Sequence, residues 1–120
     1  MRLITIPLAV LALLAGGDTA FAHALLRHAQ PPAGATVKAA PEELLLVFSE
    51  AVEPAFTDVT VTDQSGARVD SGTVHTDPND ATHLLVGVHR LVPGTYKVVW
   101  RVTSIDTHKT EGNYQFTVQP

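Results

Sequence analysis

Two segments near the C-terminus, residues 95–102 and 112–118, place an aromatic or β-branched residue at every second position. A period of two is the geometry of a β-strand, in which successive side chains point to opposite faces of a sheet. The apolar members are Tyr96, Val98, Trp100 and Val102 in the first segment and Tyr114, Phe116 and Val118 in the second. These segments predict two strands that each bury one face, and they restrict the chain to folds built around a sheet.

The preceding residues follow the same short-strand pattern. Further strands are predicted at 43–48, 58–63, 68–75 and 83–88, separated by turn formers at 30–34, 64–66, 77–80 and 93–94. Segment 43–48 is apolar on both faces, which predicts a central strand covered on both sides, and Gln64-Ser65-Gly66 predicts a hairpin turn. No helical period or repeat is sustained, so one all-β antiparallel sandwich or barrel is expected.

The N-terminus has the three parts of a secretory signal. Met1-Arg2 is positive, Leu3 to Ala15 is almost wholly apolar, and Ala20-Phe21-Ala22 provides the small residues of a cleavage site. The apolar run is shorter than the roughly 20 residues that span a bilayer. We therefore predict that residues 1–22 are a signal peptide cleaved after Ala22, and that residues 23–120 are an exported domain.

Composition limits what this domain can bind and how it is stabilised. Cleavage would remove one cation, Arg2, and one anion, Asp18, so the net charge stays at -4. Without a basic run, the domain has no electrostatic footprint for nucleic acid, and nothing after residue 22 is apolar enough to enter a membrane. The sequence contains no cysteine, so stability must come from a packed core.

Two features point to a metal site. Cleavage would leave His23 with a free amino group beside its imidazole, and two such nitrogens can chelate copper or nickel. Asp106-Thr107-His108 lies in the connection predicted between the last two strands, residues 104–111. In extended backbone Asp106 and His108 would share a face with Cα atoms roughly 6.6 to 6.8 Å apart. The alternative for this D-x-H motif is a solvated loop, or an aspartate that orients a surface histidine.

The mature chain resembles the CopC family of periplasmic copper-binding proteins, also called the CopC/YobA type. The resemblance covers the following segments: His23-Ala24, residues 32–37, Val47-Phe48-Ser49-Glu50, residues 94–100, residues 104–108 and residues 112–116. It implies a small Greek-key β-sandwich, cupredoxin-like or immunoglobulin-like. It also implies Cu(II) held by the His23 amino and ring nitrogens with Asp106 and His108, and it places Glu50 near the metal as an outer or distant ligand.

The donor types agree with that metal. Cu(II) favours a tetragonal set of nitrogen and oxygen donors, whereas Cu(I) prefers sulfur. The only methionine, Met1, leaves with the signal, so the chain departs from family members that have a methionine-rich second site. The remaining histidines lie at irregular spacings and are expected to be solvated or half-packed; they are His28, His75, His83 and His89.

Three classes of function follow from these features. The favoured one is a periplasmic Cu(II) carrier or buffer, not an enzyme, whose partners are the copper ion and an inner-membrane copper transport protein. A copper oxygenase with a histidine brace is the second, but it needs open coordination positions, and Asp106 would fill one. A metal-free immunoglobulin-like adhesion or structural module is the third, in which His23 follows the cleavage point by chance.

Overall fold

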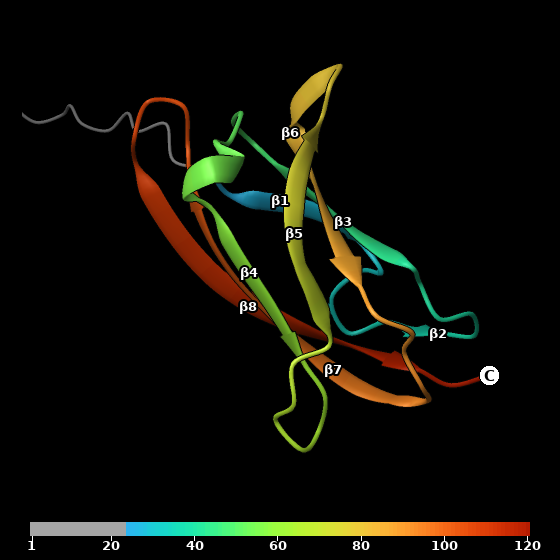
Figure 1. Ribbon diagram of the computed structural model, residues 1–120. Helices are drawn as coiled ribbons and strands as arrows, with labels where there is room; N and C mark the ends of the chain where they lie inside the picture. The colour runs from blue at the N-terminus through green and yellow to red at the C-terminus, as the bar shows by residue number, and fades with distance from the viewer. Residues whose placement is uncertain (1–23) are drawn as a thin grey trace, which may run out of the picture.

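The computed structural model describes residues 24–120, which form two four-stranded sheets packed face to face (Figure 1). The sheets have the strand orders β1-β3-β6-β5 and β2-β8-β7-β4. The strands are β1 (Leu26–Gln30), β2 (Thr36–Val37), β3 (Glu43–Phe48), β4 (Asp58–Thr62), β5 (Asp70–Asp77), β6 (Asp80–Val88), β7 (Gly94–Thr103) and β8 (Lys109–Val118). A 3-10 turn, Pro54–Phe56, precedes β4. The prediction of an all-β sandwich is confirmed.

Connections between the sheets give the sandwich its Greek-key character. Only β5–β6 and β7–β8 are hairpins of neighbouring strands, whereas the other connections cross from one sheet to the other. All strand pairs are antiparallel except β2 with β8. No helix within residues 24–120 is long and apolar enough to cross a membrane.

The two C-terminal strands predicted from alternation pair with each other along their whole length. Tyr96 lies opposite Phe116, and Val98 lies opposite Tyr114, so the apolar faces of β7 and β8 point together into the core. The Tyr96 and Phe116 rings stack with centroids 5.5 Å apart. The alternate apolar residues of the two strands therefore form one continuous buried surface.

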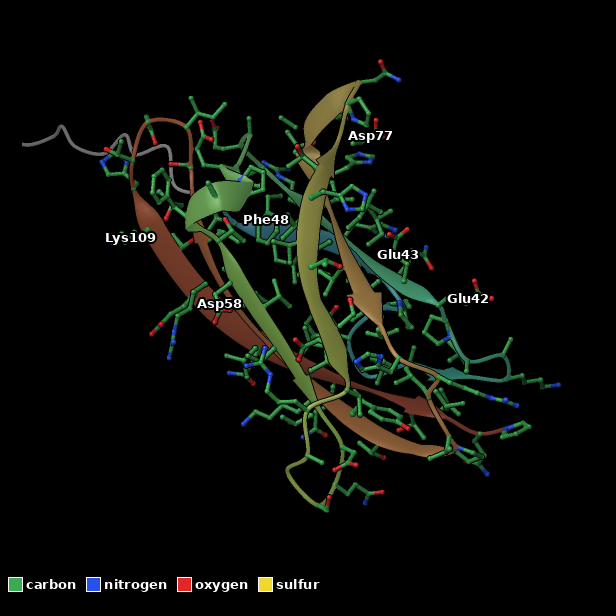
Figure 2. All side chains as sticks on the ribbon, in the orientation of Figure 1. Glu42, Glu43, Phe48, Asp58, Asp77 and Lys109 are labelled. Carbon is green, nitrogen blue, oxygen red and sulfur yellow. The ribbon has the colours of Figure 1, made fainter. Side chains whose placement is uncertain are left out.

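A second aromatic contact joins the two sheets. The Phe48 ring at the end of β3 meets the Trp100 ring of β7 edge to face, with centroids 5.2 Å apart; Figure 2 shows Phe48 between the layers. Gly112 of β8 lies directly under the indole, because a Cβ there would be 2.5 Å from Trp100 Cζ2. A side chain at position 112 would displace the tryptophan.

Some predicted details are wrong or incomplete. Segment 43–48 is central in its sheet, but only one face is buried, since Leu45 and Val47 are partly exposed on the outer surface. The hairpin predicted at 64–66 is present but short: Asp63 N donates to Ala67 O at 2.9 Å and Val69 N donates to Val61 O at 2.8 Å. Beyond this closure the chain crosses between sheets, since β4 and β5 belong to different ones. Strands β1 and β2 were not predicted, because short strands beside prolines give little periodic signal.

One buried carboxylate links β5 to β4 of the other sheet. The Asp70 side chain is 1% exposed and accepts a hydrogen bond of 2.8 Å from the Val61 backbone N–H. Its other oxygen accepts one of 2.7 Å from Arg68 Nη2. Burial opposes ionisation of Asp70, but the bonds from Arg68 and Val61 outweigh it and lower the pKa of this carboxyl below its usual value.

We expect Asp70→Asn to lower the free energy of unfolding at pH 7 by about 1–3 kcal/mol, because the charged acceptor of the buried Val61 bond and of the Arg68 ion pair is lost. A carboxyl whose pKa is depressed by folding stabilises the native state above its unfolded pKa, about 3.9, and loses that effect as pH falls through the folded pKa. The difference from wild type should therefore shrink in acid. Urea titrations at several pH values measure it, with exposed Glu42→Gln as the control; a pH-independent difference would contradict this role.

Candidate metal centre

The D-x-H motif lies in the tight connection between β7 and β8. Because β8 begins at Lys109, the connection is shorter than the predicted 104–111. The backbone is turned, not extended as predicted, and Thr107 has a left-handed φ of 74°. Two backbone bonds close the turn, from Ser104 N to His108 O at 2.9 Å and from Thr107 N to Ser104 O at 2.8 Å.

Asp106 and His108 nevertheless converge. His108 Nδ1 lies 3.4 Å from Asp106 Oδ2, and about half of each side chain is exposed. A hydrogen bond from the Ser104 hydroxyl is the main reason that the pKa of Asp106 lies below its ordinary value, with further contributions from the His108 backbone N–H and ring. The aspartate is thus ionised, accessible and beside an imidazole, which is a suitable pair of donors for a divalent cation.

Buried Ser104 holds this pair in place through hydrogen bonds. The residue is 1% exposed, and its hydroxyl donates to Asp106 Oδ1. The same oxygen lies 3.3 Å from both the backbone N and the backbone O of His108. The sequence did not single out Ser104, although serine hydroxyls commonly bond to backbone groups within a few residues, as this one does with His108.

The start of the described chain lies beside the same connection. Ala24 is fully buried, and its carbonyl accepts a hydrogen bond of 2.6 Å from the Thr110 hydroxyl, two residues after His108. Leu25 and Ser49 exchange two further bonds, from Leu25 N to Ser49 Oγ at 2.9 Å and from Ser49 N to Leu25 O at 2.8 Å. The predicted ligand His23 precedes this anchored segment and lies outside the described residues.

Glu50 is exposed at the end of β3, next to Ser49. The residues that follow it pair with the β7–β8 connection, because Ile105 N donates to Ala51 O at 3.1 Å and Val52 forms a bridge with Ser104. The backbone of Glu50 therefore runs between the N-terminal segment and the connection that contains Asp106. This position is compatible with the outer role expected from the sequence.

Within residues 24–120, no group of three or more His, Asp or Glu side chains could hold a metal ion. Three of the other four histidines in this range have polar side-chain neighbours: His28 lies 3.2 Å from Gln30, His83 lies 3.3 Å from Asp80, and His75 lies 4.0 Å from Glu43. Asp106 and His108 are thus a pair of potential donors, and within residues 24–120 no third side chain of this kind joins them in a group that could hold a metal ion.

Comparisons with known proteins agree on one family. A family model described as the CopC domain matches residues 26–119. Protein YobA of Escherichia coli strain K12 is 40% identical over 100 residues, which are 82% of this chain and 81% of YobA. The crystal structure of CopC from Methylosinus trichosporium OB3b matches with a TM-score of 0.77 at 35% sequence identity. The match covers 82% of this chain and 95% of the CopC chain. PcoC, titled a methionine-rich copper resistance protein from Escherichia coli, matches with a TM-score of 0.71 at 34% identity. This match covers 82% of this chain and 100% of the PcoC chain.

The role of Ser104 can be measured without any metal. In Ser104→Ala the pKa of Asp106 should rise toward the ordinary value near 3.9, because the hydroxyl donor that favours the carboxylate is gone. NMR titration of the Asp106 carboxyl carbon reports this pKa. Thr110→Ala is the matched control, since it removes a hydroxyl that contacts Ala24 and not Asp106. Equal Asp106 pKa values in Ser104→Ala and wild type would refute the assignment.

Proposed function

The chain belongs to the CopC family, and from that premise we propose that it is an exported carrier or buffer that binds one Cu(II) per mature chain. PcoC, a relative with the same fold, is titled a copper resistance protein. Membership of the family supports copper handling as the general function of this chain. The observation that best supports the finer proposal is the 3.4 Å approach of Asp106 to His108 beside the anchored N-terminal segment.

The proposed ligand set is completed by cleavage. Cutting after Ala22 would make His23 the first residue, with an amino nitrogen and a ring nitrogen that can both bind the ion. Its Cα lies one peptide bond, about 3.8 Å, from that of Ala24. Because Ala24 is held against Thr110 near the Asp106–His108 pair, this covalent constraint supports His23 as the source of the missing donors.

Glu50 is proposed to act outside the ligand set. Its side chain is exposed at the junction of the three segments that meet here, where a carboxylate can accept a hydrogen bond from the amino group or from a ring N–H. Such a bond would orient a ligand and raise its basicity. Direct coordination by Glu50 is not needed, because His23, Asp106 and His108 already provide three nitrogens and one carboxylate.

The donor set favours Cu(II) over Cu(I). The sequence has no cysteine, and its single methionine is Met1, which leaves with the proposed signal. PcoC, by contrast, is titled methionine-rich. Nitrogen and carboxylate donors suit Cu(II), which is the strongest binder among the first-row divalent ions.

We treat copper as cargo, not as a catalyst. Asp106 would occupy a coordination position that a copper oxygenase must keep open for its reaction, and this supports a carrier over the enzyme alternative. A periplasmic carrier would receive copper there and deliver it to an inner-membrane copper transport protein. The export signal predicted for residues 1–22 from their sequence pattern supports this location.

The first prediction tests the amino terminus. Protein that starts at His23 should bind one Cu(II) at least about tenfold more tightly than protein with one extra residue before His23, a difference of about 1.4 kcal/mol. The extra residue turns the amino nitrogen into an amide with no basic lone pair. Competition titrations with a chromophoric chelator measure both affinities, and equal values would remove His23 as a bidentate ligand.

The second concerns the two ligands in the β7–β8 connection. Asp106→Ala and His108→Ala should each weaken Cu(II) binding while cooperative unfolding is retained, since both side chains are exposed and outside the core. Titration and thermal unfolding of each variant provide the two readouts. His89→Ala, at an exposed histidine after β6, is the matched control and should bind as wild type. Unfolding of either ligand variant would contradict their placement.

The third concerns pH. Copper competes with protons for an amino group of reference pKa near 8 and imidazoles near 6.5, so binding releases protons and acid reverses it. Affinity should therefore fall as pH drops from about 8 to 5. Titrations across this range measure the slope, and a flat profile would show that these nitrogens do not bind the metal.

A further inference from the structure

Exposed apolar side chains gather around the candidate metal centre. Residues 24–120 have four exposed large hydrophobic residues, and three of them, Leu25 at 59%, Phe56 at 72% and Ile105 at 57%, lie at this end of the sandwich. We call these three residues the apolar rim. The fourth, Val92, lies at the opposite end, where its carbonyl accepts a bond from the Tyr96 hydroxyl near the start of β7.

Backbone hydrogen bonds hold each member of the apolar rim in place. Leu25 exchanges two bonds with Ser49, and Ile105 N donates to Ala51 O at 3.1 Å. The Phe56 carbonyl accepts a bond of 2.9 Å from the buried Thr103 hydroxyl, one residue before Ser104. The exposed side chains thus stand on an ordered backbone, so docking a partner would cost little additional ordering of the chain.

A groove of about 480 Å³ runs beside Phe56 on the outer face of the second sheet. Asp58, Arg101, Lys109 and Glu111 line it, with an ion pair of 3.2 Å between Arg101 and Glu111. Asp58 and Lys109, both labelled in Figure 2, are the first residues of β4 and β8, and Lys109 directly follows the β7–β8 connection. The groove therefore begins at Phe56 of the apolar rim and is lined by charged side chains.

The net charge of the described chain is concentrated at this end. Strand register and loop contacts place seven carboxylates and three cations here: Glu50, Glu53, Asp58, Asp77, Asp80, Asp106 and Glu111 with Arg27, Arg101 and Lys109. The rest of residues 24–120 balances four against four: Glu42, Glu43, Asp63 and Asp70 with Lys38, Arg68, Arg90 and Lys97. The surplus of negative charge therefore lies at the end of the sandwich that carries the apolar rim.

We propose that the apolar rim is the docking surface for a partner protein whose contact patch is apolar at its centre and cationic around its edge. The proposal rests on the proposed function only in that this partner exchanges copper with the adjacent site. A second copy of the chain would bring two acidic ends together, and an anionic lipid surface would be repelled as well. Charge complementarity therefore selects a cationic protein surface.

The test uses metal-free mature protein and a synthetic amphipathic helix of leucine and lysine without histidine. Titration into ¹⁵N-labelled protein should shift the amide signals of Leu25, Phe56 and Ile105, and added salt should weaken the binding. A helix with glutamate in place of lysine should bind much more weakly. Phe56→Ala should weaken binding about fivefold or more, which corresponds to about 1 kcal/mol.

Two matched controls come from the opposite end of the molecule. Val92→Ala truncates the fourth exposed hydrophobic residue and should leave binding of the lysine helix unchanged. Asp58→Lys should weaken binding through charge, whereas Glu42→Lys should have a much smaller effect because Glu42 is remote from the apolar rim. Phe56→Ala should also keep wild-type Cu(II) affinity, since Phe56 is not a proposed ligand.

The outcomes separate this proposal from the proposed function. Shifts spread over other faces, equal binding of both helices, or equal effects of Phe56→Ala and Val92→Ala would overturn the docking surface. Self-association through the apolar rim in sedimentation, or binding to phosphatidylglycerol vesicles, would also overturn it. Absence of Cu(II) binding by mature protein would refute the carrier while leaving localised helix binding intact.

Discussion

The edge-to-face contact between Phe48 and Trp100 is the interaction on which the candidate metal centre depends most. It joins β3 of one sheet to β7 of the other, and the indole fits only because Gly112 of β8 has no side chain. These strands lead directly into Ser49–Val52 and Ser104–His108. Close packing in the core thus determines how the two surface segments approach each other.

Anchoring of the N-terminal segment depends on the same strands. Ala24 is bonded to Thr110 of β8, and Leu25 is bonded to Ser49 after β3. Residues distant in sequence therefore meet at one end of the sandwich. The scaffold thus holds Asp106, His108 and the segment that begins at Ala24 at one end, and such preorganisation would reduce the cost of assembling ligands from separate segments.

Within the connection, a single buried hydroxyl organises the exposed pair. Ser104 contacts the Asp106 carboxylate and both backbone polar atoms of His108, so the turn and the side chains share one hydrogen-bonding centre. The contacts favour an ionised aspartate at the surface. The surrounding carboxylates give the whole end a negative potential, which attracts cations and cationic surfaces alike.

The sequence by itself determined the all-β class, most strand positions and the Asp106–His108 motif, because alternation and turn residues act locally. It did not determine which strands share a sheet: Gln64-Ser65-Gly66 lies in a short hairpin, yet beyond it β4 and β5 separate into different sheets. Nor did it show how Asp106 meets His108, since the pair converges through a left-handed Thr107 and not through extended backbone. The role of Ser104 was hidden because its hydroxyl reaches Asp106 and His108 only in the turned backbone of the connection. The role of Thr110 was hidden because its partner, Ala24, is brought to it only by tertiary packing.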